Sequence, residues 1–87
     1  MQVRITRSAR KHRIGNARII EAMVDAGDPI EDGDALFYVG RDSRGVEIEI
    51  VAVPDDRNEG GLAIIHAMPT RFRVKRETAD VPGGDGP

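Results

Sequence analysis

The hydrophobic period of this chain changes once, and that change limits the folds open to it. In residues 17–26 the apolar side chains recur at helical spacing and form one stripe: Ile19, Ala22, Met23 and Ala26. Asn16 is a predicted N-cap for this helix, and Gly27 and Pro29 are predicted to end it. From Ala35 the period is two, which is typical of β-strands. The order predicts an α+β domain.

Four short apolar runs predict strands. They cover residues 2–5, 35–40, 46–53 and 62–68. The last three runs are separated by turn sequences, so we expect them to form an antiparallel meander. In the third run Ile48 and Ile50 point one way while Glu47 and Glu49 point the other. One face of the sheet should therefore be packed and the other at least partly wet.

The segment before the main helix predicts a second, shorter helix. Thr6 or Ser8 can cap it, and it should run to about Arg13. We therefore expect an N-terminal strand and two helices packed on a three- to four-stranded antiparallel sheet, as one domain of residues 1–76. Residues 70–76 could add a strand or lie as an arm. The tail of residues 77–87 has little to bury and is predicted to be disordered.

Charge is segregated along the chain. Residues 1–20 carry six basic side chains and no acid, whereas residues 21–40 carry six acids and no base. The formal net charge of −2 therefore hides a basic arm joined to an acidic middle. A fold seldom needs clustered cations that repel one another, so they indicate a polyanion or an acidic partner. A solvated face explains them equally simply.

The amino-acid composition argues against several kinds of protein. The chain has no cysteine, hence no disulfide and no thiolate metal site, and a reducing compartment is indicated. No apolar run approaches the ~20 residues of a membrane span, and the start lacks a signal-peptide core, so we expect a cytoplasmic protein without membrane contact. Two phenylalanines, one tyrosine and no tryptophan are poor material for a base-stacking platform.

Two histidines and two glutamates are the candidate acid–base groups. His66 ends a predicted strand near later arginines and is a candidate general acid. His12 lies among cations that disfavour its charged form, so it is a candidate base. Glu47 and Glu49 project from one side of a strand about 6.6 Å apart, and either could be the base beside His66. Half-buried or exposed histidines and solvated glutamates remain the simpler explanations.

Six cations are candidates for binding phosphate. Arg71 and Arg73 alternate and so would share one side of an extended segment. Protection of the last strand edge explains such a run as well. The histidines and carboxylates match no metal-ligand spacing, so we expect neither metal nor cofactor. The phosphate-binding candidates are Arg7, Arg10, Lys11, Arg13, Arg71 and Arg73.

Short motifs resemble a family of bacterial toxins. Lys11-His12-Arg13-Ile14, followed by Ala17 and Glu21-Ala22, resembles the KHG[IV]…EEA opening of BrnT-type toxins. Residues 40–45 followed by VEIEIVAV resemble the G…G hairpin of that family, and residues 62–67 stand at its IRIISAR strand. The resemblance spans about residues 5–73. The Ser-Ala-Arg of the family is His66-Ala67-Met68 in this chain.

The resemblance implies a RelE/ParE-like fold and a type II toxin–antitoxin module. Its toxin is a metal-independent endoribonuclease that cleaves messenger RNA, free or ribosome-bound, and that a cognate antitoxin neutralises. In that reaction the 2′-hydroxyl attacks the adjacent phosphorus, so the protein supplies a base, an acid and cations. A second hypothesis stays open: a non-catalytic module that grips a protein or nucleic acid. An exposed final strand also makes a homodimer credible.

Overall fold

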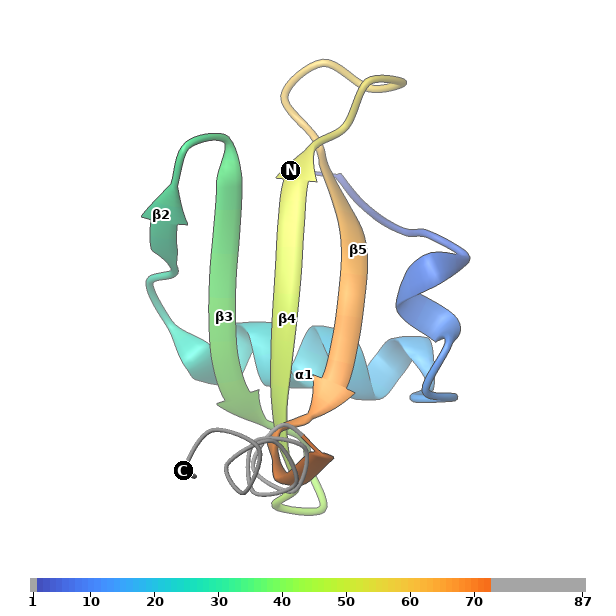
Figure 1. The fold of residues 1–87 in the computed structure, drawn as a ribbon, viewed down its shortest axis with the longest axis vertical. Helices are drawn as coiled ribbons and strands as arrows, with labels where there is room; N and C mark the ends of the chain where they lie inside the picture. Colours follow the sequence, from blue (N-terminus) through green and yellow to red (C-terminus); the bar gives the residue numbers. More distant parts are fainter. Residues whose placement is uncertain (1, 73–87) are drawn as a thin grey trace, which may run out of the picture.

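A mixed five-stranded sheet is the frame of the molecule, and one α-helix crosses it (Figure 1). The structure is a computed structural model that describes residues 2–72. The sheet has the order β1-β5-β4-β3-β2. Its strands are β1 (Val3–Ile5), β2 (Ile30–Asp32), β3 (Ala35–Arg41), β4 (Glu47–Pro54) and β5 (Leu62–Pro69). The helical elements are a 3-10 turn, η1 (Ser8–Arg10), and α1 (Asn16–Ala26).

The predicted α+β class is confirmed, but the predicted sheet is wrong in two respects. It has five strands, because Ile30–Asp32 pairs with β3 across a two-residue turn in which Gly33 adopts a φ of 62°. It is also mixed, because β1 lies parallel to β5 while the other neighbours are antiparallel. Parallel pairing at the β1 edge depends on a long-range contact that a local pattern does not contain.

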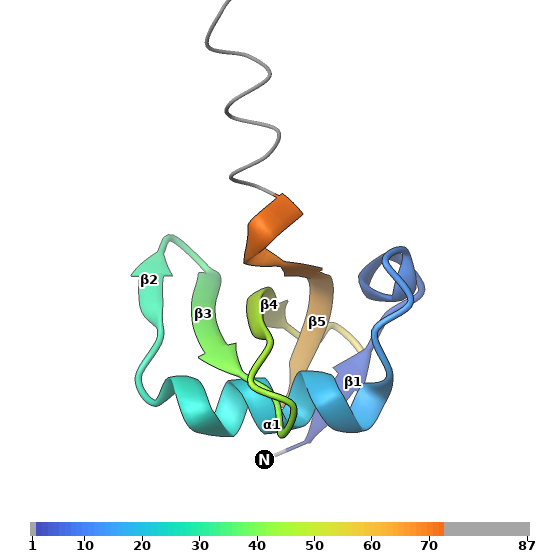
Figure 2. The ribbon, with the colours of Figure 1, turned by 90° about the horizontal axis from the view of Figure 1, so that it is seen from below.

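The predicted main helix is confirmed as α1. Its buried side chains, Ile19, Ala22 and Met23, join the core with Ile50 and Ile64 of the sheet. The capping prediction is wrong at its start: Gly15 is the N-cap, with no side-chain cap bond, and Asn16 is already helical. Figure 2 shows α1 along one face of the sheet.

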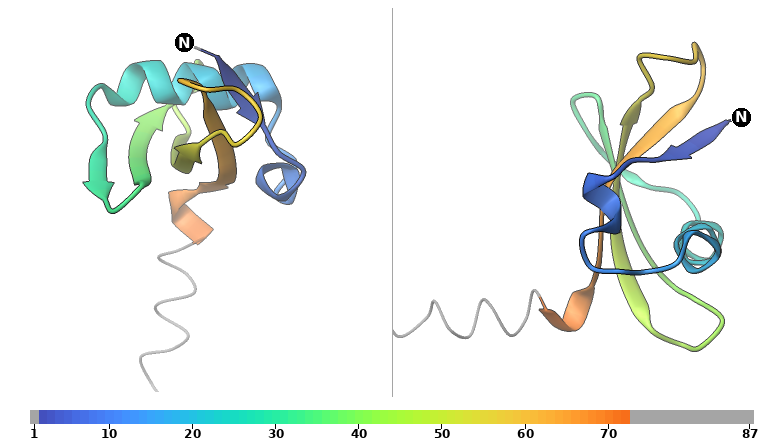
Figure 3. Two further views of the ribbon diagram at one scale, coloured as in Figure 1. Left: turned by 90° about the horizontal axis from the view of Figure 1, so that it is seen from above. Right: turned by 90° about the vertical axis from the view of Figure 1, so that its right-hand side faces the viewer.

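The second predicted helix is only a single 3-10 turn, η1. It does not lie on the same face of the sheet as α1. Figures 2 and 3 place η1 on the other side of the sheet, next to the β1–β5 edge. α1 therefore covers one face of the sheet, while η1 packs its buried Ala9 against the β5 side of the molecule. We call the face that points away from α1 the open face.

Two carboxylates of the acidic middle hold the β3–β4 turn to α1. The Ser43 N–H donates to Glu21 Oε1 at 2.9 Å, and the Arg41 N–H donates to Asp25 Oδ2 at 2.8 Å. Arg18 Nε adds an ion pair to the buried Asp42, at 2.6 Å. Three charged side chains of the basic and acidic segments, Arg18, Glu21 and Asp25, are therefore engaged in contacts within the molecule.

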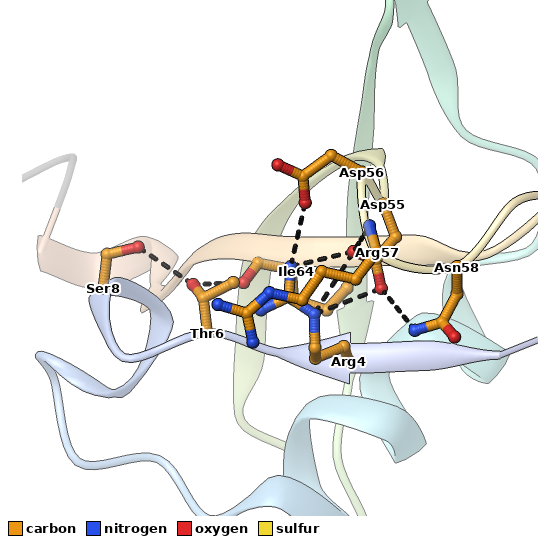
Figure 4. Close-up of polar contacts among 8 residues, drawn as sticks. All are labelled: Arg4, Thr6, Ser8, Asp55, Asp56, Arg57, Asn58 and Ile64. Carbon is orange, nitrogen blue, oxygen red and sulfur yellow. Dashed lines mark hydrogen bonds and ion pairs between the residues drawn. The ribbon is translucent and has the colours of Figure 1, made fainter.

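A second buried carboxylate organises the loop between β4 and β5 (Figure 4). Asp55 accepts from Arg4 Nη2 at 2.9 Å, from the Arg57 N–H at 3.0 Å and from Asn58 Nδ2 at 3.2 Å. The Asp55 side chain is 1% exposed, so these donors replace water. Arg4 thereby ties β1 to this loop.

Both buried aspartates titrate below their ordinary range. The hydrogen bond from Arg4, followed by that from the Arg57 N–H, holds the pKa of Asp55 well below its usual value against the effect of burial. Burial acts to raise the pKa of Asp42, but hydrogen bonds from Arg18 and from the Val46 and Arg44 N–H groups outweigh it and lower the pKa.

We expect the fold to lose stability in acid because of these two groups. Their folded-state pKa values are depressed, so the unfolded chain takes up protons first once the pH falls below about 4. The stabilisation is complete above that pH and is lost on further acidification. Urea denaturation at about pH 7 and about pH 3 should show a clearly lower midpoint in acid.

Asp55→Asn is the matched variant for this acid effect. It should start from a lower midpoint at neutral pH and lose less on acidification, because one titrating group is gone. Equal losses in Asp55→Asn and wild type would contradict the assignment to Asp55.

Three sequence predictions fall partly or wholly outside the described residues. Arg73 and the tail of residues 77–87 lie beyond them, and residues 70–72 begin a helical turn instead of extending β5. Within residues 2–72, no helix is long and apolar enough to cross a membrane.

Candidate functional site

A β-bulge in β5 places His66 on the open face. Val51 of β4 pairs with His66, whereas Ala52 pairs with Ile64, so Ile65 is an extra residue between them. Side chains alternate along a strand, so without the extra residue His66 would share the core side of Ile64. The bulge reverses the alternation and turns His66 away from α1.

His66 is held there by a carboxylate from the neighbouring strand. His66 Nε2 and Glu49 Oε2 are 2.9 Å apart. The His66 side chain is 33% exposed and that of Glu49 is 18% exposed, so the pair is partly shielded but open to a ligand. Glu49 was predicted from its sequence position to be a candidate base; in the structure it lies in hydrogen-bond contact with His66, where it can orient the imidazole.

The second histidine reaches the same place from the segment after η1. The ring centroids of His12 and His66 are 6.2 Å apart, and the planes are nearly perpendicular at 82°. The residues are 54 positions apart in sequence. The fold therefore joins two imidazoles and one carboxylate into one group, which we call the His–Glu–His cluster (His12, Glu49 and His66).

The helical turn of residues 70–72, which follows β5, lies beside His12 of this cluster. Thr70 Oγ1 donates to Glu47 Oε1 at 2.7 Å, which ties residues 70–72 to β4. The Phe72 ring lies 5.9 Å from His12, and the Arg71 guanidinium stacks at 5.2 Å over Phe72. Glu47 thus anchors the segment that carries Phe72 to His12 and Arg71 to the ring of Phe72.

The remaining candidate cations surround His12 in the chain. Arg10, Lys11 and Arg13 are exposed, as is Arg7 at the start of η1. Arg13 adopts a φ of 60°, which is uncommon for a residue with a side chain and marks a sharp change of direction beside His12. Among residues 2–72 no acid lies within ion-pair distance of these four side chains. Their charge is therefore available to an anionic ligand.

Apolar side chains continue the open face away from the cluster. Cross-strand pairing sets Ile30 beside Phe37, Phe37 beside Val51 and Val51 beside His66. Phe37 is 39% exposed, Val39 46% and Ile30 73%. The open face therefore has a charged, titratable end at β5 and an apolar end at β2.

Two shallow hollows lie on the opposite side of the molecule. Both are lined by Ile20 and Val24 of α1, with residues of β3 or the turn after it. Neither contains a histidine. They are separate from the His–Glu–His cluster.

Each member of the cluster was a candidate from its residue type, whereas the backbone features that bring the three together were not predicted. The bulge at Ile65 and the hydroxyls of Thr6 and Ser8 that contact it were not predicted. A break in β alternation, with the apolar residues Ile64 and Ala67 three positions apart around a polar one, is the signal that could have revealed the bulge.

Within residues 2–72, no group of three or more histidine, aspartate or glutamate side chains, the His–Glu–His cluster included, is arranged so that it could hold a metal ion. No family model, curated protein or solved structure matches the chain. The function is therefore argued from the chemistry of the cluster.

Proposed function

We propose that the protein is an endoribonuclease that cleaves single-stranded messenger RNA at the His–Glu–His cluster without a metal ion. The observation that carries this proposal is the pair of imidazoles 6.2 Å apart, one of them bonded to a carboxylate. Acid and base groups on either side of one phosphodiester are what transfer to the 2′-oxygen requires. Arg71 and the exposed cations around His12 support the proposal because they can neutralise the phosphate.

Each residue has a defined part in this reaction. His12 removes the proton from the 2′-hydroxyl, whose oxygen attacks the adjacent phosphorus. His66 donates a proton from Nδ1 to the departing 5′-oxygen, because Nε2 is engaged by Glu49. The bond between phosphorus and the 5′-oxygen breaks, and the products are a 2′,3′-cyclic phosphate and a 5′-hydroxyl. Arg71 stabilises the extra negative charge on the phosphoryl oxygens.

A direct cleavage assay tests this function. The purified 87-residue protein is incubated in EDTA with a labelled single-stranded RNA, and the products are identified by mass spectrometry. We expect 2′,3′-cyclic phosphate ends, and no cleavage of a DNA oligonucleotide of the same sequence, which lacks the attacking hydroxyl. A parallel reaction with translating ribosomes tests whether the substrate is ribosome-bound RNA. Uncleaved RNA in both reactions, or cleaved DNA, would refute the proposal.

The toxin–antitoxin context is part of the same proposal and rests on the motif resemblance. A cognate antitoxin encoded beside the gene would neutralise the protein in the cytoplasm. Controlled expression should arrest growth, and co-expression of the neighbouring gene should relieve the arrest. Unchanged growth together with unchanged RNA 5′ ends would remove the toxin assignment.

The apolar end of the open face favours a second candidate function, a non-catalytic binding module. Ile30, Phe37 and Val39 are all exposed on adjoining strands, and a partner protein or a second copy of the chain would bury them. Binding of RNA or of a protein without any cleavage would be the result expected of such a module.

A further inference from the structure

The segment that follows β1 contacts the bulge that orients His66. β1 pairs with β5 as far as Ile5 and Ile64, where the regular ladder stops. Beyond that point the Thr6 N–H donates to the Ile64 carbonyl at 3.0 Å, and Thr6 Oγ1 donates to the same carbonyl at 2.7 Å. Ser8 Oγ donates to the Ile65 carbonyl at 2.9 Å. Figure 4 shows Thr6 and Ser8 side by side next to Ile64.

These hydroxyls satisfy carbonyl groups at the point where the ladder is interrupted. A bulge locally disrupts strand pairing and leaves its extra residue unpaired. The two hydroxyl oxygens lie 3.0 Å from each other, so they occupy one spot beside the bulge. Their contacts depend on the path that the backbone takes at Ile64 and Ile65, and a regular β5 would change that path. The hydroxyls therefore favour the bulged arrangement.

We propose that Thr6 and Ser8 are positioning residues for His66. By holding the bulge, their hydroxyls keep the imidazole on the open face, in reach of Glu49. The same segment continues through η1 to His12. The contacts of Thr6 and Ser8 therefore also set the spacing between the two imidazoles. The kinetic part of this inference rests on the proposed endoribonuclease function; the structural part does not.

The test combines Thr6→Val with Ser8→Ala in the full-length protein. Nitrogen NMR of the His66 ring should show resonances that move toward those of Glu49→Gln, because the bond from Nε2 to the carboxylate is less populated. With single-stranded RNA as substrate, kcat should fall roughly 10- to 100-fold with little change in KM, as expected for a misplaced catalytic group. Thr6→Ser, which keeps the hydroxyl, should retain the wild-type spectrum and kcat.

Ser43→Ala is the matched control, because it removes an exposed hydroxyl from the β3–β4 turn and should alter neither readout. If the double variant loses its dispersed backbone amide signals, Ser8→Ala alone carries the test by the same criteria. An unchanged His66 spectrum overturns the proposal, even where thermal stability has dropped. If the spectrum moves as expected but wild-type protein cleaves no RNA, the positioning role stands and the nuclease function fails.

Discussion

A Gly40→Ala variant is expected to lose a large part of the stability of the fold. A Cβ at this position would lie 2.1 Å from the carbonyl oxygen of Ala22 and 2.7 Å from the amide nitrogen of Ala26. Both atoms belong to the backbone of α1, so no side chain can rotate away to make room. The helix would have to move off the sheet.

The expected cost is about 3 kcal/mol or more, the upper range for overpacking a core. A chain of this size has a total stability of only about 5–10 kcal/mol. The displacement would also disturb the contacts of α1 with Ile50 and with the β3–β4 turn. Urea denaturation followed by circular dichroism should show the loss as a much lower midpoint.

Gly15→Ala is the matched control for this substitution. Gly15 is also next to α1, but a Cβ there meets no atom within 4 Å and its φ is −64°. Loss of a favourable N-cap residue should cost less than about 1 kcal/mol. Similar midpoints for the two variants would show that α1 does not approach β3 as closely as the structure places it.

A His66→Ala variant is expected to lose RNA cleavage almost completely while keeping its fold. Removing a general acid typically lowers the rate by about 10²- to 10⁴-fold. One third of the His66 side chain is exposed, so its loss leaves no large cavity in the core. The readouts are kcat on single-stranded RNA and the urea midpoint of the same preparation.

His12→Ala and Glu49→Gln separate the three roles in the cluster. If His12 is the base and His66 the acid, wild-type activity should have a bell-shaped pH profile, and each histidine variant should lose one limb of it. Glu49→Gln should lower kcat less than either, because it removes the orienting carboxylate and keeps the imidazole. Arg57→Ala, an exposed cation in the β4–β5 loop, should keep full activity. Full activity in His66→Ala would place any catalysis elsewhere.

Local patterns were sufficient for the elements that depend on local physics. The stripe of Ile19, Ala22 and Met23 predicted the buried face of α1, and the alternation around Ile48 and Ile50 predicted both faces of β4. These predictions succeeded because a helical or extended backbone alone decides which side chains share a face. The shared side of Glu47 and Glu49 follows from the same rule.

The reason for a glycine at position 40 was not predicted, because it depends on a distant segment of the chain. Residue 40 ends the predicted strand of residues 35–40 and opens the G…G hairpin, in which Gly45 adopts a φ of 81°. Gly40 instead pairs with Ile48 inside β3, and it lacks a side chain because α1 crosses there. Nothing in the neighbouring residues records where a distant helix will pass.

The amino-acid sequence alone specified the class of the fold, α1, three long strands and the residue types needed for acid–base chemistry. The folded molecule was needed for the parallel β1 edge, the bulge at Ile65 and the meeting of His12 with His66. The β1 edge and the meeting of the two histidines join segments more than 50 positions apart, and the bulge is a shift in register between β4 and β5. A hydrophobic period reports only on near neighbours, so the side of the sheet that His66 occupies depends on tertiary contacts.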